Sequence, residues 1–473
     1  MPVFIDQSPL HVLLARKGLP YAMLAVITLL AYLALSQAPP EGLTENGWRS
    51  IIVFCLCLIL WVTQLLPLSV TSLMGLALLP LLGVLPADDA YGMFGNSAVF
   101  FILGAFMLAA GVIKSGLSEH VALALVGKVG LGPKRLLLTM LFLPACMAAF
   151  IPEHAVAAVM LPIVWELVRG LGLRPGHRYA QALFFAMAWG AIIGGVATLL
   201  GGARGPLALG LVEELTGKSF SFLDWTLAAG PLVIGMLVVG AVLLLVVTPF
   251  EGLDIQSARE RIEKRQLELG DLSLQGKVMA LLLFVTVLMW ITAGHDLGLA
   301  SIALVSVVLM FALRLVSWKE VESHVNWGVV LMYGGAIAVG KALTVTGAGI
   351  WLAQELLPSG LAGIALLSLL ALITLLMTES VSNAAAVAIL LPVVIPFGME
   401  AGIDPVTIAM AVGIIAGFAF MLPMGTPPNA MIYGTGYIEL ASMLRFGVIL
   451  SLSALLLFIL VSGTWWPLVG LGV

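Results

Sequence analysis

The sequence predicts an all-α polytopic membrane protein with about eleven transmembrane helices and two re-entrant hairpins, arranged as an inverted repeat. Three observations lead to this prediction: the apolar composition, the spacing of the apolar segments, and two sets of similar motifs in the same order. The 473 residues are 61% hydrophobic and 10% charged, and the mean hydropathy is +1.15. Water-soluble domains are much less apolar.

The apolar segments are spaced as membrane spans. A helix needs about 20 mainly apolar residues to cross about 30 Å of hydrocarbon. Two apolar stretches, 136–168 and 361–400, are too long for one span and too interrupted for two, so we interpret each as a re-entrant hairpin. Eleven other segments come close to the length of a span: 20–37, 50–65, 68–86, 98–116, 180–200, 228–248, 278–293, 297–314, 327–346, 407–424 and 444–463.

Basic residues predict the orientation. With the N-terminus inside, seventeen of the 21 Lys and Arg residues lie on the cytoplasmic side and only Arg49 and Lys218 lie outside. This bias places the N-terminus in the cytoplasm and the C-terminus outside a cell (inner) membrane. The first segment could also be a signal peptide, but Pro39, Pro40 and this topology favour a retained helix. The net charge of −4 gives no indication of nucleic-acid binding.

Internal similarity divides the chain into two halves. PEHAVAAVMLP at 152–162 aligns on SNAAAVAILLP at 382–392, GAFMLAAGVIKSG at 104–116 on GAIAVGKALTVTG at 335–347, and GGARG at 201–205 on GTPPN at 425–429. The number of spans between them gives the copies opposite orientations. We therefore expect an N-terminal segment with the first helix (1–45), a first repeat (46–250), a cytoplasmic connector (251–277) and a second repeat (278–473).

The interruptions within the repeats predict where a site lies. Non-helical backbone at membrane depth is tolerated only against protein or a wet cavity. The hairpin tips near 152–154 and 382–384 and the helix breaks near 201–206 and 425–429 should therefore meet. Helix N-termini at these points favour an anion, and released carbonyls favour a small cation. This is the plan of secondary transporters.

Three longer motifs resemble the divalent anion/sodium symporter family, which carries dicarboxylates, citrate or sulfate. They are TESVSNAAAVAILLPV at 378–393, AFMLPMGTPPNAMIYGTGYI at 419–438 and WVTQLLPLSVTSL at 61–73, in which Gln64 stands where a glutamate is usual. The resemblance implies alternating access by an elevator or rocking motion, a homodimer, and a small anionic substrate held with sodium between two hairpin tips.

The resemblance implies a site in the C-terminal half. Thr378 and Asn383 would hold Na⁺ together with backbone carbonyls near Val381 and Gly425. The substrate would contact the second tip and break at Ser382, Asn383, Ala384, Thr426 and Pro427, with Ala384 replacing the usual threonine. Hydroxyl, amide and carbonyl oxygens suit a small cation, and Ser and Asn also donate to carboxylates. Glu379 follows the family pattern and is expected to brace the hairpin.

The N-terminal half departs from this pattern. Pro152, Glu153 and His154 occupy the positions of Ser382, Asn383 and Ala384, Ala148 replaces Thr378, and Gly202-Ala203-Arg204-Gly205 replaces Thr-Pro-Pro-Asn. Most side-chain ligands of a first sodium site are therefore absent. We expect Glu153, His154, Gly202 and Arg204 to line the substrate site, with Arg204 as a tethered cation paired with Glu153.

Several alternatives remain. Glu153 and Arg204 could form a purely structural pair, and the protein could be a sodium-independent or proton-linked exchanger in which Arg204, Glu153 and His154 replace the first sodium site. A membrane enzyme with Glu153 and His154 as acid and base is disfavoured, because HExxH and GxSxG motifs are absent. A channel explains the inverted repeats less well. Lys341, near a helix end, is expected to snorkel.

Overall fold

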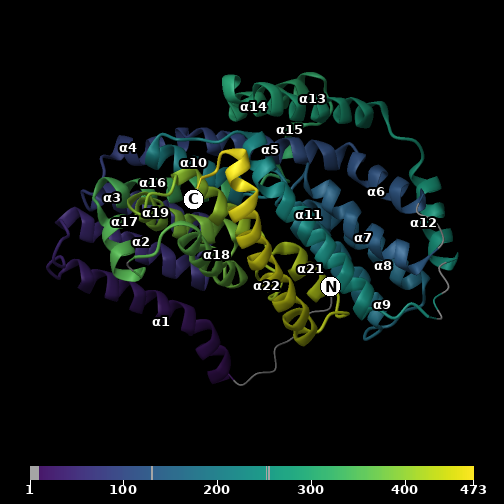
Figure 1. The fold of residues 1–473 in the computed structure, drawn as a ribbon, viewed down its shortest axis with the longest axis horizontal. Helices are drawn as coiled ribbons and strands as arrows, with labels where there is room; N and C mark the ends of the chain where they lie inside the picture. Colours follow the sequence, from purple (N-terminus) through teal and green to yellow (C-terminus); the bar gives the residue numbers. More distant parts are fainter. Residues whose placement is uncertain (1–9, 129–131, 252, 254–255, 359, 473) are drawn as a thin grey trace.

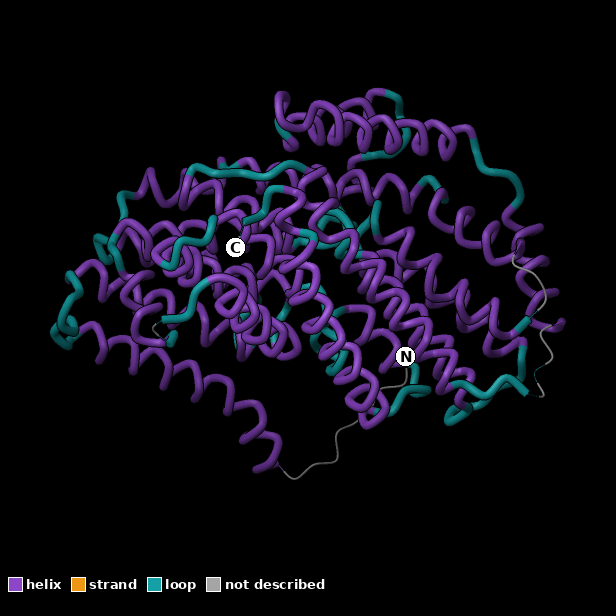
Figure 2. The backbone as a smooth tube through the Cα atoms, viewed as in Figure 1, coloured by secondary structure: helices purple, strands orange, loops and turns teal. Residues whose placement is uncertain are grey.

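The computed structural model describes residues 10–128, 132–251, 253, 256–358 and 360–472, and within them it is helical without strands (Figure 2). Helix α1 (Leu10–Leu35) lies at the edge of the bundle and packs against the start of the first repeat (Figure 1). The helix breaks and loops, shown in teal in Figure 2, separate short helices inside the bundle. An all-helical membrane protein is thus confirmed.

The helices follow the same order in both halves. The first set is α2 (Glu45–Thr63), α3 (Leu68–Leu81), α4 (Ala87–Gly92) with η1 (Met93–Gly95), α5 (Ser97–Lys114), α6 (Leu117–Lys128), α7 (Pro133–Ala148), α8 (Glu153–Gly170), α9 (Arg178–Gly194), α10 (Arg204–Thr216) and α11 (Phe222–Val247). The second set is α13 (Leu274–Leu297), α14 (Leu299–Ala312), α15 (Trp318–Glu322), α16 (Trp327–Val345), α17 (Ala348–Leu356), α18 (Gly363–Ser380), α19 (Asn383–Glu400), α20 (Pro405–Ile415), α21 (Pro427–Gly434) and α22 (Leu440–Thr464), which η2 (Trp466–Val469) follows.

Contacts between the two halves occur in equivalent pairs of helices. Helix α3 packs along α16, and its counterpart α14 packs along α5, the counterpart of α16. Likewise α10 contacts α19, and α21 contacts α8. These paired contacts are what an inverted repeat requires, because each element of one half meets the equivalent partner in the other. The limits 46–250 and 278–473 of the two halves stay predictions, which this helix order supports.

Helix length separates the predicted spans into two groups. In the described part of the chain, nine helices are long and apolar enough to cross a membrane. Seven of them fall on predicted spans, and the other two, α18 and α19, are the arms of the second hairpin. The spans predicted at α3, α9, α14 and α20 are helices of only 11 to 17 residues. The total of eleven spans therefore stays a prediction.

Both hairpins are present as pairs of helices with a short break between them. Residues 149–152 separate α7 from α8, and Val381 and Ser382 separate α18 from α19. Each tip starts a new helix: Pro152 precedes α8 without a side-chain cap, whereas the Ser382 hydroxyl accepts a hydrogen bond from Ala385 N at 3.3 Å.

The two helix breaks begin earlier than predicted. The segment expected near 201–206 is unwound over 195–203, and the one expected near 425–429 over 416–426. The predicted span 407–424 is therefore helical only as far as Ile415. Helix α9 lies against the backbone of α7 as it approaches the first break: a Cβ at Gly194 would lie 2.1 Å from Ala145 O, so glycine allows this close contact.

The connector contains α12 (Gln256–Leu269), which lies beside α6 and α8 at one end of the bundle (Figure 1). Arg265 pairs with Glu119 of α6 at 2.7 Å and also with Glu166 of α8. These carboxylates raise the pKa of Arg265 further, against the opposing effect of its partial burial. One connector side chain thus links the arm of the first hairpin to a neighbouring helix.

Candidate functional site

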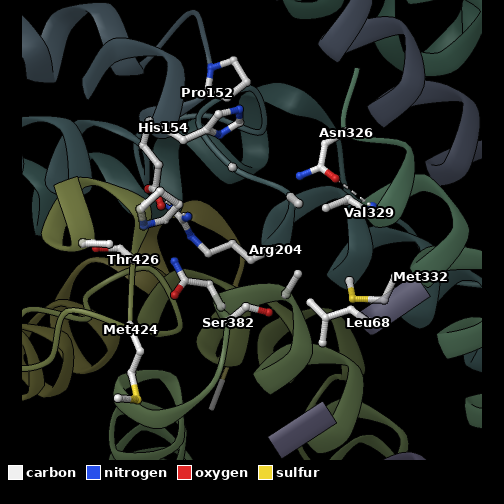
Figure 3. Close-up of a pocket in the computed structure, with 18 of the residues that line it drawn as sticks. Leu68, Pro152, His154, Arg204, Asn326, Val329, Met332, Ser382, Met424 and Thr426 are labelled. Atoms are coloured by element: carbon white, nitrogen blue, oxygen red, sulfur yellow. Dashed lines mark hydrogen bonds and ion pairs between the residues drawn. The ribbon is translucent and has the colours of Figure 1, made fainter. Parts of the chain in front are cut away.

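A cavity of about 470 Å³ lies where the two hairpin tips and the two helix breaks meet. All nine residues predicted to contact the substrate line it: Glu153, His154, Gly202, Arg204, Ser382, Asn383, Ala384, Thr426 and Pro427. Gly425 from the predicted sodium site lines it as well. Figure 3 shows Arg204 between the first tip, marked by Pro152 and His154, and Ser382 of the second. The tertiary structure therefore brings the two sets of predicted residues together.

Backbone and side-chain hydrogen bonds tie the first tip to the first break. Glu153 N donates to Gly201 O at 3.0 Å, and the Thr198 hydroxyl donates to Ala149 O at 2.6 Å. Trp225 of α11 donates from Nε1 to Val196 O at 2.9 Å. These bonds satisfy polar groups that the unwound backbone exposes inside the bundle, so the tip and the break are held in a defined arrangement.

Glu153 and Arg204 form a buried ion pair at the first tip. Arg204 Nη1 lies 3.3 Å from Glu153 Oε2, and the two side chains are 2% and 7% exposed. Arg204 Nε and Nη2 have no hydrogen-bond partner in the described part of the protein. A guanidinium offers five donors, so one carboxylate oxygen at this distance leaves most of its binding capacity available. The arginine is thus held in place by Glu153 through one of its nitrogens.

Arg204 also reaches the second half of the site. A Cβ at Gly417, in the second break, would lie 2.4 Å from Arg204 Nε and 2.6 Å from its Cζ. Only glycine leaves room for the guanidinium at this point. Sequence reasoning missed Gly417, because it lies within the predicted span 407–424, where a glycine carries no specific signal.

The second tip collects oxygen atoms around the Asn383 amide. The Thr378 hydroxyl donates to Ala416 O at 2.7 Å. The inward end of the amide lies 2.8 Å from Thr378 Oγ1, 3.2 Å from Ala416 O and 3.2 Å from Gly425 O. With the amide nitrogen at that end, these contacts are hydrogen bonds; with the oxygen there, four oxygens face one another. Ala416 was not predicted, and Val381 is a buried, extended residue at the end of α18.

Glu379 fastens the second hairpin to the second break. Its carboxylate accepts backbone hydrogen bonds from Phe420 N at 2.8 Å, Met421 N at 2.9 Å and Leu422 N at 3.1 Å, and one from Ser451 Oγ at 3.2 Å. The carboxylate thus gives three backbone N–H groups of the unwound segment an acceptor. The bracing contact expected of Glu379 is thereby confirmed.

Asn429 stabilises the same break from the other side, and sequence reasoning did not single it out. Its Nδ2 donates to Ala419 O at 3.1 Å and to Leu422 O at 3.4 Å. Its Oδ1 and the hydroxyl of Thr426 are buried without a hydrogen-bond partner in the described part of the chain. Polar atoms of this kind are normally satisfied, so the region is suited to a polar ligand.

The opposite wall of the cavity is formed by helices whose sequences resemble ordinary membrane spans. Leu68 of α3, Phe106 of α5 and Met332 of α16 line it, together with Asn326, whose Oδ1 accepts from Val329 N at 3.3 Å (Figure 3). The His154 ring contacts Phe106 edge-on, with centroids 6.4 Å apart. Hydropathy alone could not identify these residues. A fully apolar helix has no distinct polar face, so the neighbouring helices decide which of its faces lines the cavity.

Two further side chains of α16, Tyr333 and Lys341, make contacts that the sequence did not predict. Tyr333 of α16 donates to Ala203 O and so connects the opposite wall to the first break. Lys341 has a nearby partner: its Nζ lies 2.7 Å from Glu214 Oε1 of α10, and the two side chains are 29% and 21% exposed. The snorkelling of Lys341 stays a prediction, and the structure adds a carboxylate partner on a neighbouring helix.

Broken helices in inverted repeats around a cavity that both hairpin tips line define the protein as a membrane transporter. Residues 17–471 match the model of the sodium:sulfate symporter transmembrane region, so the chain belongs to that family and is a transporter, not an enzyme. It is 27% identical over 467 residues to the sodium-dependent dicarboxylate transporter SdcS of Staphylococcus saprophyticus, covering 93% of this chain and 89% of that protein. SdcS of Staphylococcus aureus is also 27% identical, over 445 residues, covering 88% and 85%.

Solved transporter structures share the fold. MtrF of Neisseria gonorrhoeae, described as illuminating a class of antimetabolite efflux pumps, matches with a TM-score of 0.60 and 17% identity over 90% of this chain and 96% of its own. The YdaH transporter of Alcanivorax borkumensis matches with a TM-score of 0.59 and 16% identity, over 90% and 100%. At these identities the likeness concerns architecture alone.

Proposed function

We propose that this chain is a sodium-coupled secondary transporter that moves small divalent anions across the cell membrane by alternating access. The relatives in Staphylococcus are named as sodium-dependent dicarboxylate transporters, which supports a dicarboxylate over citrate or sulfate. Alternating access by an elevator motion, a homodimeric assembly, and an N-terminus inside with the C-terminus outside are parts of the same proposal.

The observation that carries the proposal is the buried, incompletely paired guanidinium of Arg204. Its Nε and Nη2 are free of protein partners in the described residues, and the side chain lines a cavity that also holds Ser382, Asn383 and Thr426. One carboxylate of a substrate would take the guanidinium donors, and the second would take the hydroxyl and amide donors of the second tip. Two separated anion-binding regions favour a divalent substrate.

The cluster at the second tip fits a sodium ion. Thr378 Oγ1, Ala416 O, Gly425 O and the Asn383 amide are neutral oxygen-bearing groups, which is the ligand type that hard cations prefer. With its amide oxygen turned inward, Asn383 would complete a set of four oxygens. The ion would neutralise part of the substrate charge, so sodium and dicarboxylate would each favour binding of the other. The backbone carbonyl of Val381 is a further proposed ligand of the sodium ion.

In this proposal the protein has one sodium site, in the second half, and none in the first half. At the counterpart of Asn383 stands Glu153, and the Arg204 guanidinium pairs with it 3.3 Å away. A tethered positive charge thus occupies the neighbourhood where the second half holds its neutral oxygens. The same observation favours the second candidate function, a sodium-independent or proton-linked exchanger in which Arg204, Glu153 and His154 replace the cation.

Uptake into proteoliposomes tests the two functions. We expect labelled succinate to accumulate against unlabelled internal succinate, and we expect accumulation to require sodium with a Hill coefficient close to one. Counterflow requires alternating access, so its absence would exclude a transporter of this substrate. Accumulation that is independent of sodium would favour the exchanger, and a Hill coefficient clearly above one would contradict the loss of the first sodium site.

A further inference from the structure

A second polar cavity, of about 430 Å³, lies at the ends of three helices and shares no lining residue with the transport site. Arg178 is the first residue of α9, Val247 is the last residue of α11, and Ser442 and Arg445 lie in the first two turns of α22. These helices pack against one another, and α11 and α22 run side by side (Figure 1). The cavity is therefore placed at one edge of the helix bundle.

Five polar side chains line this cavity without an ion-pair or hydrogen-bond partner for the side chain in the described part of the chain, and the Arg445 guanidinium lies over the Phe446 ring, 5.8 Å from its centroid. Arg178 and Arg445 form no ion pair there, and Gln181, Ser442 and Thr248 take part in no side-chain hydrogen bond. The Thr248 hydroxyl is buried as well. Two arginines and three neutral polar groups without carboxylate partners indicate a site for an anion, since guanidinium pairs best with carboxylate and phosphate.

The other walls of the cavity are apolar and aromatic. Phe185 stacks on Trp189 with ring centroids 5.0 Å apart, and the Phe446 ring meets Phe185 at 5.7 Å. Beside the cavity, α11 and α22 expose Val242, Val246, Leu444 and Val448. In a membrane protein, exposed apolar residues of this kind face acyl chains. The anion-binding end is thus continuous with a hydrocarbon-facing surface.

We propose that this cavity binds an anionic phospholipid, with the phosphate between Arg178 and Arg445 and an acyl chain along α11 and α22. The site has the two parts of such a ligand: charge complementarity at the helix ends and apolar surface next to it. Basic residues gather at this end of the bundle, which the sequence places in the cytoplasm, where the leaflet carries negative charge. Aromatic rings at the same level are typical of the membrane interface.

The other repeat provides an internal comparison. Where Arg178 begins α9, Pro405 begins α20, and Leu227 occupies in α11 the helix position that Arg445 occupies in α22. The charges at this counterpart already have partners: Asp404 and Lys218 form an ion pair with each other, and the Asp224 carboxylate accepts a hydrogen bond from Ser221 N at 2.8 Å. The arginines are therefore present in only one of two equivalent places. A ligand enriched in one leaflet accounts for this asymmetry, whereas a requirement of the fold would apply to both.

Native mass spectrometry of the purified, full-length protein tests the proposal with phosphatidylglycerol as the probe. We expect phosphatidylglycerol to bind at least tenfold more tightly than phosphatidylcholine. An arginine near the membrane surface contributes roughly a fivefold gain in affinity, so R178Q and R445Q should each weaken binding about fivefold, and the double variant about 30-fold. Arg174→Gln is the matched control, because Arg174 is exposed at the same end of the bundle but does not line the cavity.

Each contrary result has a definite meaning. Equal binding of phosphatidylglycerol by wild type and double variant would overturn the proposal, and so would equal loss in Arg174→Gln. Displacement of the lipid by millimolar inorganic phosphate would show a simple anion site and would also overturn it. Melting temperatures of all variants in detergent without lipid establish that the protein is folded, so a loss of binding with an unchanged melting temperature supports the assignment.

Discussion

Arg204 and Glu153, 51 residues apart in the chain, form an ion pair that is almost completely buried where two interrupted helices meet. The pair leaves Arg204 Nε and Nη2 without a protein partner in the described residues. If the pair served only to neutralise a buried charge, we would expect two parallel hydrogen bonds, because Arg and carboxylate readily form them. The donors left over support our proposal that the substrate anion binds to Arg204.

Breaking this pair should affect both folding and binding. Removal of one partner of a buried ion pair costs about 3–5 kcal/mol, because the other charge is left uncompensated. We expect Arg204→Gln to lower the melting temperature and abolish succinate-induced stabilisation. The double variant E153Q/R204Q should recover much of the melting temperature but not the response to succinate. Lys341→Gln, which breaks the more exposed pair with Glu214, is the control and should keep that response. Retention of the succinate response in Arg204→Gln would contradict the role assigned to the guanidinium.

The sodium site at the second tip makes a separate prediction. Hydrogen bonds and contacts to charged groups contribute about 1.5–3 kcal/mol, so Thr378→Val and Asn383→Ala should each raise the sodium concentration for half-maximal uptake about tenfold or more. Thr374→Val is the matched control, since the Thr374 hydroxyl is buried on the same helix but donates to Leu370 O. Uptake kinetics over a range of sodium concentrations provide the measurement. If all three variants respond to sodium equally, these residues do not hold the ion.

Glu379 should matter through the position of the second break. Glu379→Gln would place an amide where three backbone N–H groups require an acceptor, at a cost of about 1.5–3 kcal/mol. We expect a lower melting temperature and slower uptake. Ser451→Ala removes only one of the four donors and should have a smaller effect on both. Hydrogen exchange at residues 420–422 would locate the change, and unaltered exchange there would argue against the bracing role.

His154 distinguishes the two candidate functions. Its imidazole lines the cavity against Phe106, and no hydrogen-bond partner for it is found among the described residues. As a donor to the substrate it would contribute about 0.5–1.5 kcal/mol, so His154→Gln should raise KM roughly 2- to 10-fold and leave the dependence on sodium and pH unchanged. A proton-linked exchanger would instead lose its pH dependence in this variant. Uptake measured between pH 5.5 and 8 separates the two results.

Much of this architecture could be predicted from residue patterns, and the failures have identifiable causes. Long apolar runs marked α2, α5, α11, α13, α16 and α22, because a span requires length and hydropathy alone. The ends of α9 and α20 were misplaced, because contacts with other segments satisfy the unwound backbone, as where Trp225 Nε1 donates to Val196 O. The partner of Lys341 could not be predicted for a similar reason: Glu214 comes from a distant part of the chain.

The candidate site was predictable where the repeats could be aligned. The alignment of PEHAV on SNAAA identified both tips, and all nine predicted substrate residues line one cavity. The residues of the opposite wall, such as Leu68 and Met332, had no such signal. The helices that carry them are apolar all round, so no periodicity distinguishes the face that lines the cavity from the face that packs against neighbours.

The sequence by itself determined the class of protein, the duplication and the chemical character of each tip, because these depend on composition and local order along the chain. Only the tertiary structure decided that Arg204 meets Glu153, that Gly417 makes room for the guanidinium, and that Ala416 joins Thr378 and Asn383. Those contacts depend on how closely separate helices approach and at which residue each one unwinds. Packing between distant segments decides both, and local patterns do not encode it.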